Sequence, residues 1–215
     1  MSLNGNILVP NKIDKKNQLP IFNNAPSFRV FFAVLLIILA VLGRTIFHLG
    51  ENIEFVTAAS LLAGSFLGLF WSITVPLVSM AISDLIIGNT LIFLFTWSAY
   101  LIIGILGFIF LRSSKGIVSQ TIKATFTGVL ASFVFFLWTN FGVWLLDSFG
   151  MYSDGLSGLI ESYIFGLPFL KMNLLGNLFL VPLSFILFHL FLIFYPSIFK
   201  SASKTERSYI KKGSY

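Results

Sequence analysis

Long apolar runs separated by short polar breaks make up most of this chain. The first run covers residues 30–47, close to the roughly 20 helical residues that cross a bilayer core. The second run, residues 55–88, would be about 50 Å long as one helix, whereas the hydrocarbon layer is about 30 Å thick. Because proline suits the first turn of a helix, Pro76 can begin a return helix. We therefore expect this run to fold back near Trp71 and Ser72.

Three more apolar runs follow, at residues 91–111, about 121–147 and about 173–197, and the breaks between them read SSKG and MYSDGLSG. The sequence thus predicts six helices, two of them short, in an all-α integral membrane protein built as a six-helix transmembrane bundle. We divide the chain into a polar cytoplasmic tail, a six-helix membrane domain and a basic cytoplasmic tail, at residues 1–28, 29–199 and 200–215.

The composition is that of a membrane protein, because 57% of the residues are hydrophobic, only 10% are charged and 26 of the 215 are Phe. Cysteine is absent, which excludes disulfides, thiolate metal sites and cysteine nucleophiles. The first apolar run follows a polar stretch and has no small-residue cleavage site after it, so we expect no removed signal peptide.

Positive charge predicts the orientation of the helices, since cytoplasmic loops are enriched in Lys and Arg. With both termini cytoplasmic and the 148–172 loop external, all of the fourteen basic residues except Arg44 and Lys171 are on the cytoplasmic side. A single span over 55–88 would translocate the basic residues of 112–123, so the charge supports a fold-back, although a re-entrant pair would have the same parity. The net charge of +6 indicates contact with anionic lipid and not with nucleic acid.

Several polar residues within the apolar runs fall near the predicted outer surface. Arg44 and Asp84 lie at the outer ends of the first and third helices, and a charge in hydrocarbon needs a partner, so we expect these two to form an ion pair, directly or through one water. The other polar residues at this level are Asn52, Glu54, Asn89, Asn140, Trp144, Asp147, Asn173 and Asn177. Convergent polar groups in a partly apolar cavity are typical of a small-molecule site.

We therefore predict a cavity on the order of several hundred Å³ between the first, third, fifth and sixth helices, with the Met151–Glu161 loop as a lid. The candidate substrate-binding residues are Arg44, Asp84, Asn140, Trp144, Asn173 and Asn177. Other interpretations remain open: the charges can be a structural ion pair, the amides can link neighbouring helices, and the aromatic residues can form an ordinary interfacial belt.

Three stretches carry a family resemblance: NIEFVTAASLLAGSFLG, VPLVSMAISDLIIGN and the segment from FFLWTNFGVWLL to GLPFLKMNLLGNLF. They resemble an uncharacterised prokaryotic membrane-protein family that is grouped with the S components of energy-coupling-factor (ECF) vitamin transporters. The similarity covers roughly residues 40–185. It implies a six-helix bundle in the prokaryotic cytoplasmic membrane that captures a vitamin-like molecule at its outer face.

The resemblance also implies docking on a transmembrane coupling subunit that is driven by two ATPases. Known S components often dock through an Ala-x-x-x-Ala pattern on the first helix, but Ala33 and Ala40 do not have this spacing. Small residues instead form a stripe on the second helix, at Ala59, Ala63, Gly64 and Gly68. This stripe is either the partner-docking surface or a site of close packing within the bundle.

One pattern suggests catalysis, because GLSG at residues 155–158 matches the Gly-x-Ser-Gly of intramembrane serine proteases. With Ser157 in an outer loop, the candidate base His189 would lie about 22 Å down the last helix, out of hydrogen-bond reach. The chain has no His-Glu-x-x-His motif, nucleotide-binding loop or carboxylate cluster. We therefore expect no enzyme activity, no metal and no other cofactor.

Two classes of function stay open. The first is a substrate-capturing component of an ECF-type transporter, and the second is a structural membrane protein, such as a rod-shape-determining subunit with a similar small bundle. Polar groups left uncompensated around a cavity would favour the first class. The identity of a substrate does not follow from the sequence.

Overall fold

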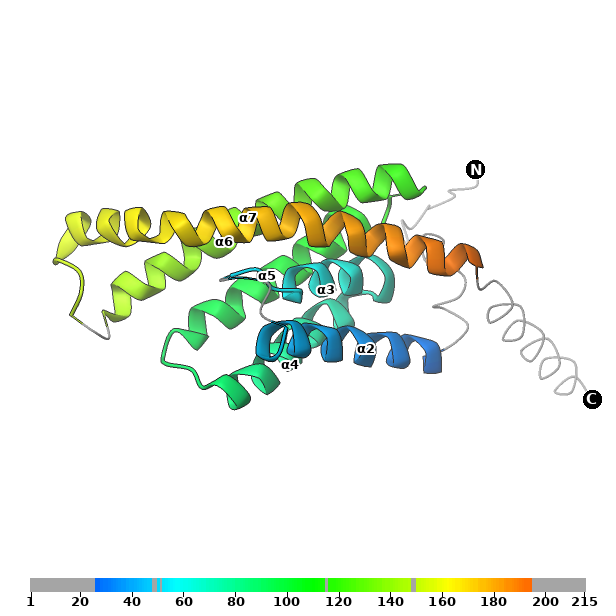
Figure 1. Ribbon diagram of the computed structural model, residues 1–215, viewed down its shortest axis with the longest axis horizontal. Coiled ribbons are helices and arrows are strands. Elements are labelled where there is room, and N and C mark those ends of the chain that lie inside the picture. The colour runs from blue at the N-terminus through cyan, green and yellow to red at the C-terminus, as the bar shows by residue number, and fades with distance from the viewer. Residues whose placement is uncertain (1–25, 48–49, 51, 115, 148–149, 195–215) are drawn as a thin grey trace, which may run out of the picture.

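A computed structural model describes residues 26–47, 50, 52–114, 116–147 and 150–194, and this part of the chain contains helices and no strand (Figure 1). The tails expected at residues 1–28 and 200–215 lie outside the described residues, except that residues 26–28 begin the first helix. The elements are α2 (Pro26–Thr45), α3 (Val56–Leu62), the π-helical turn η2 (Ala63–Leu67), α4 (Leu69–Ile87), α5 (Phe93–Leu111), α6 (Ile117–Leu146) and α7 (Gly155–Phe194).

Five of the described helices are long and apolar enough to cross a membrane, namely α2, α4, α5, α6 and α7. The predicted all-α, multi-pass membrane architecture is confirmed at this level. The sixth apolar element, α3 continued by η2, covers only residues 56–67, or about 18 Å by helical rise. It is too short to cross a hydrocarbon layer of about 30 Å by itself.

The predicted fold-back between the second and third helices is present, but it lies at Gly68 and not at Trp71 and Ser72. Gly68 has φ +102° and ψ 177°, a backbone conformation that residues with a Cβ rarely adopt, and its position explains where the chain turns. The prediction that Pro76 begins the return helix is wrong, because Pro76 lies inside α4.

Pro76 lies inside α4, and α5 packs closely on the backbone carbonyl that this proline leaves without its helical donor. A proline cannot donate a hydrogen bond to the carbonyl four residues earlier, which here belongs to Ser72. Gly104 of α5 lies so close to that carbonyl oxygen that a Cβ at position 104 would overlap it. The sequence thus pairs a proline in one helix with a glycine in the next.

The small-residue stripe of α3 and η2 packs inside the bundle. Ala59 and Ala63 have no exposed surface, and a Cβ at Gly64 would lie 2.8 Å from the Gly104 carbonyl oxygen of α5. Gly68 is buried as well. The stripe therefore allows α3, η2 and α5 to approach closely, and it leaves no surface that a partner could contact.

Helices α6 and α7 form a long hairpin. They lie side by side in Figure 1, and the ends at residues 146 and 155 extend beyond α2, α4 and α5. By helical rise α6 is about 45 Å long and α7 about 60 Å. The predicted external loop at residues 148–172 is therefore wrong over most of its length, because α7 begins at Gly155.

The start of α7 is fixed by local hydrogen bonds. The Glu161 carboxylate accepts hydrogen bonds from the backbone N–H of Ser153, at 3.4 Å, and from its hydroxyl, at 3.1 Å. A Cβ at Gly158 would overlap the Ser153 carbonyl oxygen, so a glycine is needed there. The glycines and serines that suggested a flexible loop instead build the first turns of a helix.

Candidate functional site

The predicted ion pair between Arg44 and Asp84 is confirmed. Arg44 is in the last turn of α2, and its Nη1 contacts Oδ1 of Asp84 in α4. The same Nη1 donates to the Ser83 hydroxyl at 2.7 Å, and Nε donates to Oε1 of Glu54 at 3.3 Å. The side chains of Arg44 and Asp84 are only 13% and 7% exposed, so each charge depends on the other in an apolar setting.

The remaining oxygens of the two carboxylates are also paired. Oδ2 of Asp84 accepts hydrogen bonds from Asn89 Nδ2 and from the Trp97 indole N–H, the latter at 2.7 Å. The buried Tyr100 hydroxyl donates to Oε2 of Glu54 at 3.1 Å. This set of side chains, which we call the ion-pair network, links α2, the turn before α3, α4 and α5. All four carboxylate oxygens have a donor, so the network is complete without a ligand.

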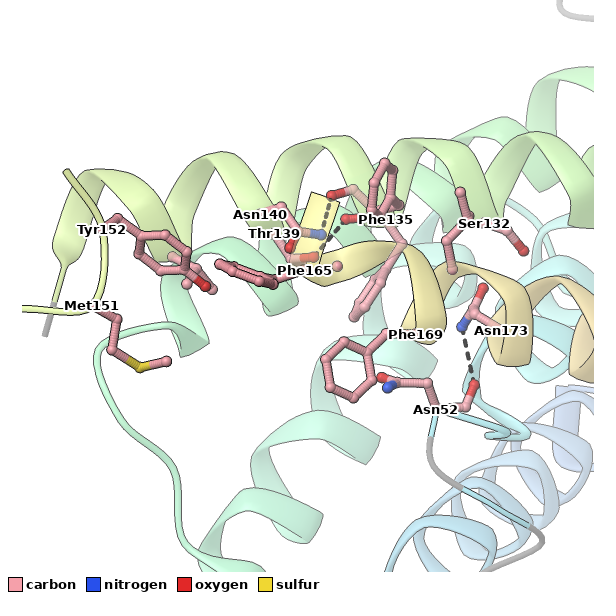
Figure 2. Close-up of a pocket in the computed structure, with 14 residues that line it drawn as sticks. Asn52, Ser132, Phe135, Thr139, Asn140, Met151, Tyr152, Phe165, Phe169 and Asn173 are labelled. Atoms are coloured by element: carbon pink, nitrogen blue, oxygen red, sulfur yellow. Dashed lines mark hydrogen bonds between the residues drawn. The ribbon is translucent and has the colours of Figure 1, made fainter. Parts of the chain in front are cut away.

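A cavity of about 420 Å³ lies between α6 and α7, away from the ion-pair network (Figure 2). Its size is within the range of sites for small organic molecules. Aromatic rings from both helices and from the turn between them form much of the wall, and they belong to Phe135, Phe136, Tyr152, Phe165 and Phe169. The polar side chains that line it belong to Asn52, Ser132, Thr139, Asn140, Tyr152 and Asn173.

Two adjacent residues of α6, Thr139 and Asn140, line this space. The Thr139 hydroxyl donates to the Phe135 carbonyl oxygen at 2.8 Å, and Asn140 Nδ2 donates to the Phe136 carbonyl oxygen at 2.8 Å. Oδ1 of Asn140 accepts no hydrogen bond from the described residues, and it lies so close to Gly166 of α7 that a Cβ there would overlap it. Gly166 therefore makes room for the Asn140 amide at the cavity wall.

The opposite end of the cavity is closed by a chain of amides. Asn173 Nδ2 donates to the Asn52 carbonyl oxygen at 3.2 Å, as Figure 2 shows. Behind Asn173, the buried Asn177 donates to Asn173 Oδ1 at 3.0 Å and to the Ser132 hydroxyl at 2.8 Å. Asn52 has φ +59°, a left-handed conformation that asparagine tolerates better than most residues. These bonds hold α6, α7 and the turn before α3 at fixed spacing.

The structure divides the six predicted substrate-binding residues into three groups. Asn140 and Asn173 line the cavity, and Asn177 supports Asn173 from behind. The half-buried Trp144 packs on Phe141, with 5.7 Å between ring centroids, and is not part of the cavity wall. Arg44 and Asp84 belong to the ion-pair network and also do not line the cavity.

The predicted position of the cavity was also partly wrong. The described wall comes from α6, α7, Asn52 and the turn between the two long helices, and neither α2 nor α4 contributes to it. Of the predicted Met151–Glu161 lid, only Met151 and Tyr152 line the space, and the chain is helical from Gly155 onward.

The aromatic wall and Gly166 were not predicted from the sequence. Phe165, Phe169 and Asn173 follow one another at i, i+4 spacing and so share one face of α7. This signal was present in the sequence, but a helix expected to begin only at residue 173 does not include the two phenylalanines. An earlier helix start would have placed them beside Asn173.

The Gly-x-Ser-Gly pattern has a structural explanation. Ser157 and His189 lie on the same helix, about 48 Å apart by helical rise. The Ser157 hydroxyl interacts with the Ser153 hydroxyl at 3.2 Å, and Gly158 packs against the Ser153 carbonyl. The described residues contain no group of three or more Asp, Glu or His side chains arranged to hold a metal ion.

Residues 24–198 match a family of unknown function, DUF6580, and the chain belongs to this family. No curated protein matches the chain, and no solved structure matches it.

Proposed function

We propose that this membrane protein binds a small organic molecule in the cavity between α6 and α7. The proposal rests on the cavity, which has the volume of a ligand site, about 420 Å³, and on Oδ1 of Asn140 at its wall, which has no donor among the described residues. Asn140 is half-buried, so this acceptor is open to an occupant of the cavity. A ligand that donates a hydrogen bond there would gain about 0.5–1.5 kcal/mol.

We further propose that the protein is the substrate-binding component of an ECF-type transporter, with both termini in the cytoplasm of a prokaryotic cell. The resemblance of the sequence to an uncharacterised family that is grouped with S components supports this role, and so does the charge distribution along the chain. A coupling subunit and its ATPases would then be the partners. Reporter fusions at Lys212 and Gly155 test the orientation, and a cytoplasmic signal at Gly155 would contradict it.

The binding proposal is tested by mass spectrometry of small molecules that remain with the protein after purification from its native membrane. We expect the wild type to retain a compound at near-stoichiometric amount and the Gly166→Leu variant to retain none, because even a Cβ at position 166 overlaps the Asn140 amide and would displace it from the cavity wall. Leu167→Phe is the matched control, since it adds bulk one residue away on a side chain that is 52% exposed. Equal retention by all three proteins would contradict the assignment of the cavity.

A structural role is the second candidate, and the ion-pair network is the observation that favours it. This network joins α2, α4 and α5, and each of its carboxylate oxygens has a donor from the protein. A scaffold protein would use such a network and would retain no compound. The same purification therefore distinguishes the two functions, provided that the wild type is folded and monodisperse.

A further inference from the structure

The walls of the cavity also restrict the chemistry of its occupant, an inference that rests on the proposed function. We infer that the ligand is an uncharged, flat molecule with a hydrogen-bond donor toward one end and an acceptor toward the other. A neutral nitrogen heterocycle with N–H and C=O groups on different edges has this chemistry. Three features of the wall lead to this class: its lack of charge, its rings and its remaining hydrogen-bonding capacity.

The cavity contains no counter-charge. All of its lining residues are uncharged. Glu54, two residues after the lining Asn52, is already bound by Arg44 and Tyr100. Asp147 accepts a hydrogen bond from a backbone N–H of the α6–α7 turn at 2.9 Å, and Lys171 is exposed and does not line the space. A charged ligand would therefore lose its hydration without gaining a partner, which is strongly unfavourable.

The aromatic rings favour a flat ligand. Phe165 and Phe169 are one helical turn apart on α7, and the Tyr152 ring lies 6.4 Å from the Phe165 ring. Phe169 and Asn52 both line the space, so apolar and hydrogen-bonding groups share its wall. Aromatic side chains interact most favourably with other π systems in stacked or edge-to-face arrangements. A planar ring can stack on such surfaces, which a branched aliphatic chain cannot do.

The remaining hydrogen-bonding groups define two ends. Thr139 has donated its one hydroxyl proton, and Asn140 one of its two N–H groups, to carbonyl oxygens of their own helix, so both offer acceptors to a ligand and Asn140 keeps a second N–H. At the other end, the side chain of Asn52 forms no hydrogen bond with the described residues, and Asn173 has a second N–H beyond the one given to Asn52. A ligand with a donor toward α6 and an acceptor toward Asn52 satisfies both ends.

The experiment uses matched pairs of probes on the full chain in lipid nanodiscs. Thermal shift and equilibrium dialysis would compare uracil with orotate, and nicotinamide with nicotinate, because each pair shares a ring and differs by a carboxylate. A third probe, 1,3-dimethyluracil, keeps the ring and carbonyls of uracil but has no N–H donor. We expect at least one neutral probe to bind at least tenfold more tightly than its charged counterpart. The dimethyl compound should bind as weakly as orotate, the charged counterpart of uracil.

Substitutions on α6 identify the side chains that bind the neutral probe. Asn140→Leu and Thr139→Val remove the acceptors on α6, and we expect each to weaken the neutral probe by roughly tenfold, as the loss of one hydrogen bond predicts. Trp144→Phe is the control, because Trp144 is an aromatic residue of α6 outside the cavity wall, and it should leave binding unchanged. Melting curves of every variant exclude unfolding as the cause.

The outcomes separate the two proposals. If a charged probe binds as tightly as its neutral partner, or if the compound retained from native membranes is an ion, the ligand class is wrong while the binding function stands. If no probe binds but a neutral heterocycle is retained from the membrane, the class is supported. If no probe binds and no compound is retained, both the ligand class and the proposed function fail.

Discussion

Two polar clusters lie within the apolar helices of this protein, and they differ in how completely their hydrogen bonds are formed. In the ion-pair network every carboxylate oxygen of Glu54 and Asp84 has a donor from the protein. In the cavity, Oδ1 of Asn140 and the side chain of Asn52 have no partner among the described residues. Polar groups that have all found hydrogen-bond partners stabilise the fold, whereas polar groups left without partners around a cavity indicate a binding site.

Removing Arg44, the cation of the ion-pair network, should cause the largest loss of stability. Arg44→Leu leaves Asp84 and Glu54 buried together without their positive partner, and the loss of one member of a buried pair costs about 3–5 kcal/mol. Asp84→Leu should cost less, because Arg44 keeps Glu54 as a partner. Thermal unfolding in detergent measures both. A melting temperature of Arg44→Leu equal to or above that of Asp84→Leu would contradict the central position of the arginine.

The double variant Arg44→Leu with Asp84→Leu tests whether the two side chains depend on each other. Residues in one network are coupled, so the combined effect should be smaller than the sum of the two single effects. Additive losses would show that the two side chains do not depend on each other.

A close helix contact should give the next largest effect. Gly104→Ala places a methyl group on the Ser72 carbonyl, so α4 and α5 must separate, and overpacking of this kind costs about 1–3 kcal/mol. Ile102→Ala on the same helix is the control, because Ile102 is 38% exposed and its loss should be smaller. A fall in melting temperature for Gly104→Ala no greater than for the control would show that the contact is looser than described.

The cavity should be the least sensitive region for stability. Thr139→Val keeps the shape of the side chain and removes only a hydroxyl that bonds to its own helix. We expect its free energy of unfolding to change by less than about 1 kcal/mol, in contrast to the ion-pair network. Retention of the native small molecule, measured by mass spectrometry, should nevertheless fall. A large loss of stability with unchanged retention would reverse the roles assigned to the two regions.

The sequence predicted the membrane helices well and their boundaries less well. Apolar runs and chain length were enough to predict the fold-back of residues 55–88, because no single helix of that length fits a bilayer. The chain turns at Gly68, which has a positive φ. In the sequence both Gly68 and Pro76 can interrupt a helix, so the position of the turn could not be predicted. The pattern of glycine and serine at residues 153–158 indicated a loop. In the structure a helix begins there, and Ser153 donates hydrogen bonds to Glu161 in its second turn.

The candidate site was predicted only in part, because some of its features depend on where the helices begin and end. The pairing of Arg44 with Asp84 follows from the cost of burying a charge, which does not depend on helix boundaries. The cavity wall does depend on them, since Phe165 and Phe169 join Asn173 only if α7 begins early. Which polar residues face a space and which pack against a neighbouring helix depends on the rotation of each helix, and residue type alone does not encode it.

An experimental structure of the protein purified from its native membrane would show whether a ligand lies between α6 and α7. We expect non-protein density there, in contact with Phe165, Phe169 and Oδ1 of Asn140, and an ion-pair network that holds no ligand. Close packing of α6 against α7, with Asn140 Oδ1 bonded to a protein donor and no density between the helices, would contradict it.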